Sequence, residues 1–127
     1  MAWSAMPLPP PARRLLGILW PASLAAIAVI SLVPAPEPPP GLPRADLLVH
    51  VAAYAWLGLV LGLHRDPGRP LVRLWLGLTA YGLALEILQA LTPWRHFSLL
   101  DGAANALGAL LGLLLARRLQ RPGKPRG

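Results

Sequence analysis

The sequence predicts an all-α integral membrane bundle of four transmembrane helices with both termini in the cytoplasm, and three observations lead to this fold class. Hydrophobic residues fill 55% of the 127 positions and charged residues only 13%, against about 25% charged residues in a soluble domain. The apolar residues form long runs, separated by segments rich in Pro, Arg and His. The Lys and Arg residues gather in clusters between these runs, which is typical of membrane flanks and not of a nucleic-acid-binding face.

Four apolar runs are long enough to cross a hydrocarbon core, which needs roughly 17 to 25 helical residues. They cover residues 15–33, 47–63, 71–91 and 99–116. Continuous apolar runs predict helices, because the strands of a membrane β-barrel alternate apolar and polar residues. Residues 1–14 are expected to form a disordered cytoplasmic segment, and 117–127 a basic cytoplasmic tail that begins as the end of the last helix. Six prolines within 34–43 predict an extended polyproline II connector.

The distribution of positive charge predicts the orientation of these helices. Four spans place both termini and the 64–70 loop on one side, and ten of the twelve Lys and Arg residues lie there, leaving Arg44 and Arg95 for the other side. The positive-inside rule assigns the ten-residue side to the cytoplasm. A cleaved signal peptide is the alternative for the first run, but its 19 residues exceed an h-region of about 7 to 15.

Polar residues recur within three of the apolar runs, where ionisable groups are costly and often mark function. Each run carries a pair spaced three or four residues apart, which places both members on one helix face. The pairs are Asp46 with His50, Glu86 with Gln89, and Asp101 with Asn105. At 1.5 Å per residue all six lie within about 8 Å of the outer helix ends. The sequence therefore predicts an outward-facing polar pocket lined by Asp46, His50, Glu86, Gln89, Asp101 and Asn105, to which the loop after the third run adds Arg95, His96 and Ser98.

Simple pairing of these groups across helices is the alternative to a pocket. We expect Arg95 to fold back over the start of the last helix and form an ion pair with Asp101. Small residues that allow helices to approach closely are expected to serve packing within the chain; they are Gly58, Gly62, Gly108 and Gly112. The chain has no Cys, which excludes thiolate metal sites and cysteine nucleophiles, and we expect neither a metal nor another cofactor.

The spacing of the polar residues resembles that of the VanZ-like family of small bacterial membrane proteins. The residues that carry the resemblance are Asp46-x-x-x-His50-x-x-x-Tyr54 and Glu86-x-x-Gln89-x-x-x-Pro93-x-Arg95-x-x-Ser98-x-x-Asp101-x-x-x-Asn105-x-x-Gly108-x-x-x-Gly112. The family often has Lys directly after the first Asp, where this chain has Leu47. The resemblance implies a four-helix protein of the bacterial inner membrane, linked through the family's namesake to teicoplanin resistance. It implies no reaction.

Three functions are compatible with these features. The first is a non-enzymatic envelope protein whose pocket binds a lipid-linked cell-wall precursor, another anionic component or a lipoglycopeptide. The second is an intramembrane hydrolase or transferase acting on a lipid phosphate, with His50 as base or nucleophile and Arg95 stabilising phosphoryl charge. The third is a small proton-coupled exporter using Glu86, which the clustering of polar residues in one leaflet disfavours. Membrane lipids are expected partners and nucleic acid is not, while the oligomeric state stays open.

Overall fold

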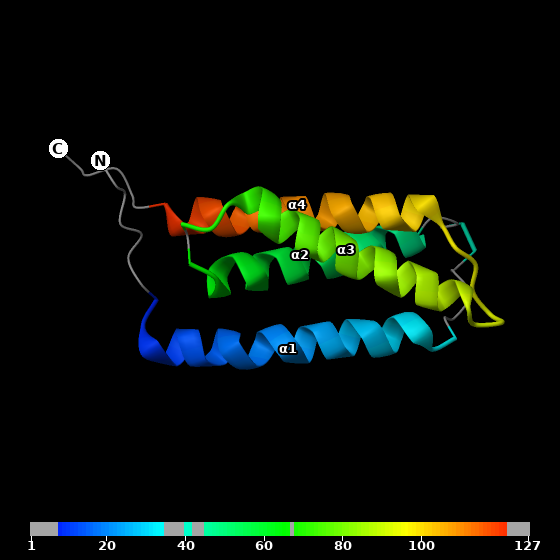
Figure 1. Ribbon diagram of the computed structural model, residues 1–127, viewed down its shortest axis with the longest axis horizontal. Coiled ribbons are helices and arrows are strands. Elements are labelled where there is room, and N and C mark those ends of the chain that lie inside the picture. Colours follow the sequence, from blue (N-terminus) through cyan, green and yellow to red (C-terminus); the bar gives the residue numbers. More distant parts are fainter. Residues whose placement is uncertain (1–7, 35–39, 42–44, 67, 122–127) are drawn as a thin grey trace.

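The computed structural model describes residues 8–34, 40–41, 45–66 and 68–121. Its secondary structure over these residues consists of four helices, which are α1 (Pro10–Leu32), α2 (Ala45–His64), α3 (Leu71–Ala90) and α4 (Leu99–Gln120). The helices alternate in direction along the chain, so that α2 and α4 run the same way (Figure 1). All four are long and apolar enough to cross a membrane. The predicted all-α class with four such helices is therefore confirmed.

The helix ends differ from the predicted ones. Helix α1 begins at Pro10, five residues before the predicted start at residue 15, so the end of the segment expected to be disordered is helical. Pro10 and Pro11 explain this start, because proline in the first helical turn loses no hydrogen bond and has a suitable φ. Helix α4 continues to Gln120 and includes part of the predicted tail. Most of the predicted polyproline connector, the first seven residues and the tail from residue 122 lie outside the described residues.

Helices α2 and α4 form the most extensive contact between any two helices of the described chain. Glycine makes this contact possible: a Cβ added at Gly108 would overlap the Val51 carbonyl oxygen, and one at Gly112 the Ala55 carbonyl oxygen. On the other helix, a Cβ at Gly58 would overlap the backbone of α4. The two backbones therefore touch directly, and this fixes the register between the parallel helices α2 and α4.

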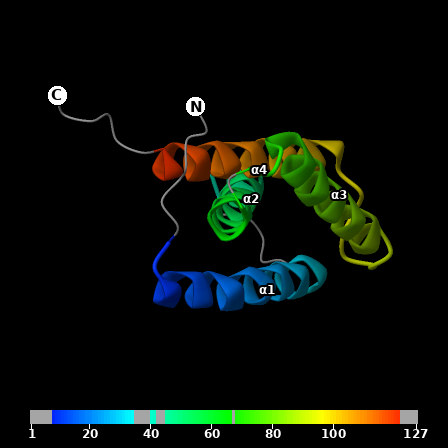
Figure 2. The same cartoon turned by 60° about the vertical axis from the view of Figure 1, so that its left-hand side comes forward.

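Helix α3 packs across this pair and completes the apolar core. The buried core residues come from all three helices, and they are Tyr54, Leu57, Leu61, Leu78, Ala109 and Leu113. Figure 2 shows α1 on the opposite side of α2 from α4. Helix α1 contains no buried residue, although Trp20, Leu24 and Ile27 pack against the core. A helix that stays apolar and exposed on most of its surface is suited to lipid surroundings.

Polar side chains from α2 and α3 attach α1 to the bundle. The Trp56 indole N–H donates to Ser23 Oγ at 2.9 Å. The Tyr81 hydroxyl donates to the Leu24 carbonyl oxygen, and Gln89 Nε2 donates to the Ser31 carbonyl oxygen at 2.7 Å. All three acceptors lie in the second half of α1, so these bonds hold that half of the helix against the bundle.

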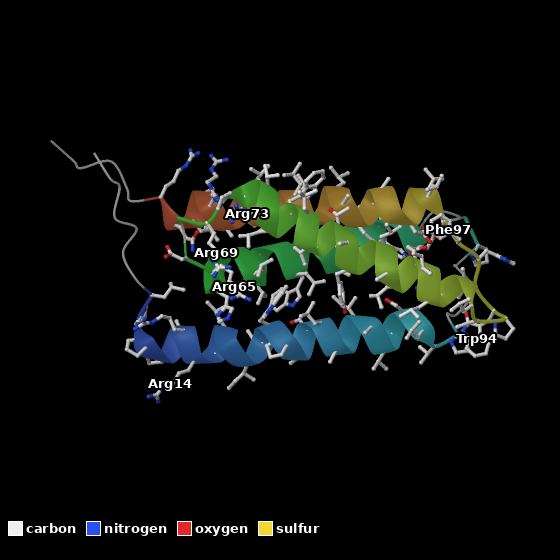
Figure 3. All side chains as sticks on the ribbon, viewed as in Figure 1. Arg14, Arg65, Arg69, Arg73, Trp94 and Phe97 are labelled. Carbon is white, nitrogen blue, oxygen red and sulfur yellow. The ribbon has the colours of Figure 1, made fainter. Side chains whose placement is uncertain are left out.

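The two ends of the bundle differ in character (Figure 3). Arg14, Arg65, Arg69 and Arg73 lie at the end where the described chain begins and finishes, whereas Trp94 and Phe97 lie at the opposite end. Among the arginines of the described residues, only Arg95 belongs to the segment that joins α3 and α4 at that opposite end. We call the two ends the arginine end and the aromatic end.

Candidate functional site

Polar side chains from three helices meet toward the aromatic end of the bundle. Helix α2 contributes His50, α3 contributes Glu86, and α4 contributes Asp101 and Asn105. We call these four residues the polar cluster. Because α2 and α4 run in parallel in a register fixed by glycine, the first turns of both helices lie side by side and bring His50 to the level of Asp101 and Asn105.

Asn105 orients the His50 ring. His50 Nδ1 lies 2.8 Å from Asn105 Oδ1, and Asn105 is only 3% exposed. An amide oxygen can only accept a hydrogen bond, so Nδ1 carries the proton and donates it. In the neutral imidazole, Nε2 then has a free lone pair.

Asp101 faces that second nitrogen of the ring. Its Oδ2 lies 3.7 Å from His50 Nε2, and both side chains are 16% exposed. This separation is too long for a hydrogen bond. Ser98 is the N-cap of α4, and its hydroxyl accepts from the Asp101 backbone N–H at 3.2 Å. The cap fixes the first turn of α4 and, with it, the position of the Asp101 side chain.

Glu86 is the most deeply buried acid of the described chain, with 2% of its surface exposed. Its Oε2 has no hydrogen-bond partner among the described residues. One carboxylate oxygen of Glu86, one of Asp101 and a ring nitrogen of His50 all lie within 4.8 Å of one another. The backbone N–H of Ser98 and the Arg95 guanidinium are further electrostatic neighbours of the Glu86 carboxylate.

The absence of a side chain at Gly82 lets Tyr54 and Asn105 pack closely against α3 beside the cluster. A Cβ added at Gly82 would lie 3.1 Å from Tyr54 Cε1 and 3.2 Å from Asn105 Nδ2, so one of these neighbours would have to shift by a few tenths of an ångström. Tyr54 is 3% exposed, and its ring centroid lies 6.4 Å from that of Tyr81. The sequence reasoning did not single out Gly82, although its spacing of four from Glu86 on one helix could have indicated a shared face.

Several predicted pocket residues have other positions or partners in the structure. Asp46, in the first turn of α2, is exposed. Gln89 is buried, but its side-chain amide donates toward α1, to the Ser31 carbonyl oxygen. These two residues share their helix faces with His50 and Glu86 but form no side-chain hydrogen bond or ion pair with the cluster among the described residues.

The expected ion pair between Arg95 and Asp101 is wrong for the described residues. Asp101 instead faces the His50 ring at 3.7 Å, a contact that is an ion pair only when the ring is protonated, and Arg95 Nε is buried without a hydrogen-bond partner among the described residues. The reason lies in the packing: α2 runs beside α4 and places His50 against the first turn of α4.

Comparison of the chain with family models, with curated proteins and with solved structures finds no match. The fold and the cluster therefore define a class, a four-helix protein with membrane-length apolar helices and a buried polar site toward one end. Any more specific function has to be inferred from the site itself.

Proposed function

We propose that the chain crosses a bacterial inner membrane four times, with both termini and the 64–70 loop in the cytoplasm. The arginine end would then lie on the cytoplasmic side, and the polar cluster near the outer surface. The sequence supports this orientation because ten of the twelve Lys and Arg residues belong to one side. The position of Arg14, Arg65, Arg69 and Arg73 at one end of the bundle, with Arg95 alone of the described arginines at the other, is consistent with it (Figure 3).

In this setting the polar cluster binds the anionic head group of a lipid-linked envelope component. The observation that carries this proposal is that Arg95 Nε and Glu86 Oε2 are both buried without a hydrogen-bond partner among the described residues, in two groups that are electrostatic neighbours. A buried polar atom without a partner costs roughly 1 to 3 kcal/mol, so a ligand that supplies the partners gains that amount. A phosphate or carboxylate would accept from the Arg95 guanidinium, and a hydroxyl or other donor of the same ligand would satisfy Glu86.

The surroundings of the site favour a lipid over a free solute. Exposed apolar residues lie within the segment between α3 and α4 and at the start of α4, and they are Leu91, Trp94, Phe97, Leu99 and Leu100. Aromatic residues at such positions are typical of the membrane interface. A ligand with its head group at the cluster could keep its acyl or prenyl chain against this apolar fringe.

The resemblance to the VanZ-like family extends the proposal to antibiotic susceptibility. A protein that holds a lipid-linked cell-wall precursor in the outer leaflet would hinder a lipoglycopeptide from reaching it. We therefore expect overexpression to raise tolerance of teicoplanin, and Glu86→Gln to abolish this effect.

An intramembrane hydrolase or transferase acting on a lipid phosphate is the second candidate. It is favoured by the His50 ring, whose Nδ1 is engaged by Asn105 and whose Nε2 is left free to take up a proton. A proton-coupled exporter is disfavoured, because its site would need access from both sides near the membrane centre, whereas the cluster lies toward one end of the helices.

Lipid retention tests the binding function. The purified protein in nanodiscs of mixed bacterial lipid is analysed by native mass spectrometry, and the anionic lipids that remain bound are identified. We expect Arg95→Gln and Glu86→Gln to retain at least about tenfold less anionic lipid than the wild type. The matched controls are Arg73→Gln and Asp46→Asn, which change exposed groups of the same types.

Equal retention by all four variants would contradict the binding function. The same preparations are incubated with labelled polyprenyl phosphates to separate the two candidates. Turnover by the wild type that is lost in His50→Ala would favour the enzyme, and no turnover in either would favour binding alone.

A further inference from the structure

We propose that the polar cluster is a binding site for a divalent transition-metal ion of the Zn²⁺ type. The ligands are His50 Nε2, a carboxylate oxygen of Glu86 and a carboxylate oxygen of Asp101. This inference goes beyond the proposed lipid binding and departs from the sequence-based expectation that no metal is bound. It does not depend on the lipid, because metal binding can be measured with the metal alone.

The distances suit three ligands of one ion. A ring nitrogen of His50 and one carboxylate oxygen each from Glu86 and Asp101 lie within 4.8 Å of one another, and His50 Nε2 lies 3.7 Å from Asp101 Oδ2. Two ligand atoms bound to Zn²⁺ at their usual distances, with a tetrahedral angle between them, are about 3.4 Å apart. The His50–Asp101 separation therefore needs a contraction of only a few tenths of an ångström. The other separations among the three ligand atoms must also shorten, and this requires rotation of a carboxylate toward the ring.

The chemistry of the three atoms calls for a cation between them. With the Nδ1 proton donated to Asn105, His50 Nε2 presents a lone pair, and both carboxylates are acceptors as well. Three acceptors thus converge with no donor among them. Glu86 is 2% exposed and its Oε2 has no partner among the described residues. The Arg95 guanidinium is one positive neighbour of the Glu86 carboxylate, and a metal ion at the centre of the cluster would add a positive charge in direct contact with the carboxylate oxygens.

Asn105 supplies the support that metal-binding histidines normally have. Such a histidine donates its other ring N–H to a neighbouring acceptor, which fixes the tautomer and the ring orientation. The 2.8 Å contact from His50 Nδ1 to Asn105 Oδ1 has this form. Asn105 and the three ligands come from α2, α3 and α4, so an ion would link the three helices of the core.

The ligand set also selects the class of metal. One imidazole and two carboxylates suit Zn²⁺, Fe²⁺, Mn²⁺ or Co²⁺, whereas Mg²⁺ and Ca²⁺ prefer oxygen ligands throughout. Two carboxylates balance the charge of a divalent ion. Three protein ligands leave a coordination position open, and the partial exposure of His50 and Asp101 gives an ion access to the site.

Metal titration of the purified full-length protein tests this proposal. The chain is prepared in detergent with a tag free of histidine, stripped with a chelator and titrated with Zn²⁺ by calorimetry, and bound metal is counted by mass spectrometry. We expect one ion per chain in the wild type and an affinity at least about 100-fold lower in Glu86→Gln and Asp101→Asn. Asn105→Ala should weaken binding by roughly 10 to 100-fold.

Two control variants test whether metal binding depends on the polar cluster. Asp46→Asn and His96→Ala remove an exposed acid and an exposed histidine near the same end of the bundle, and both should bind Zn²⁺ like the wild type. Substitution with Co²⁺ should give the wild type a visible absorption band that shifts in His50→Gln. The helix content of every variant is checked by circular dichroism.

Either of two results would overturn the proposal. One is a folded wild type that binds no Zn²⁺ or Co²⁺. In that case a proton, and not a metal ion, would be the positive charge held between the three side chains. The other is metal binding that persists unchanged in Glu86→Gln and Asp101→Asn, which would place the ion elsewhere. Neither result bears on lipid retention, so this proposal and the proposed function can fail separately.

Discussion

At the scale of single residues, the contact between His50 and Asn105 determines which ring nitrogen is free. Because Asn105 is buried, loss of either partner leaves a polar group without its hydrogen bond. We expect His50→Ala and Asn105→Ala each to lower the free energy of unfolding by about 1 to 3 kcal/mol. The double variant should lose less than the sum of the two, with a coupling of at least about 0.5 kcal/mol.

Unfolding in detergent micelles with increasing denaturant measures these values. The matched comparison is the cycle of Arg95→Ala and Asp101→Ala, which should be close to additive because Asp101 pairs with His50 in the structure. Additive losses in the His50–Asn105 cycle, together with strong coupling between Arg95 and Asp101, would contradict the partners described here.

Sequence spacing predicts which polar residues share a helix face, but not which residue on another helix they meet. It placed His50, Glu86, Asp101 and Asn105 near one level, and in the structure they lie together. The prediction that Asp101 pairs with Arg95 is wrong, because the i,i+4 rule says nothing about how two helices are rotated against each other. Their mutual rotation depends on the direct contact between α2 and α4.

At the scale of the elements, this contact depends on the absence of side chains at glycine. A Cβ at Gly112 would overlap the Ala55 carbonyl oxygen, which is backbone and cannot move aside. We expect Gly112→Ala to force α2 and α4 apart and to lower the free energy of unfolding by about 1 to 3 kcal/mol or more. The loss of metal or lipid binding should accompany it, since the cluster spans both helices.

Gly77→Ala is the matched control on α3. Nothing lies within 4 Å of a Cβ at Gly77, and alanine has the better helix propensity by about 1 kcal/mol. This variant should be as stable as the wild type or more so by the same denaturant measurement. Equal destabilisation by both substitutions would show that the α2–α4 contact is not as close as described.

The existence of the helices could be predicted from the sequence, but their ends could not. Apolar runs mark the part of a helix suited to a membrane core, whereas a helix itself continues as long as its backbone hydrogen bonds can form. Helix α1 therefore starts at Pro10, and α4 extends to Gln120 past the basic pair that follows its apolar run.

At the scale of the whole molecule, the positive charges and the polar cluster define a direction along the bundle, because they lie toward opposite ends. All described arginines except Arg95 belong to one end of the bundle, where Figure 3 labels four of them. The cluster lies toward the other end, near the start of α4. If the four helices cross a bacterial inner membrane, this direction places the cluster where it can meet lipid-linked components of the outer leaflet. The central claim is therefore a four-span protein with its polar site on the side away from the cytoplasm.

Single cysteines test this claim most directly, because the chain has none of its own. His96→Cys places one in the exposed segment at the aromatic end, and Gly68→Cys places one in the exposed loop at the arginine end. Intact bacterial cells expressing each variant are treated with a membrane-impermeant maleimide, before and after lysis. We expect labelling of His96→Cys in intact cells and of Gly68→Cys only after lysis. Labelling of Gly68→Cys in intact cells, with His96→Cys protected until lysis, would contradict the orientation and place the polar cluster on the cytoplasmic side.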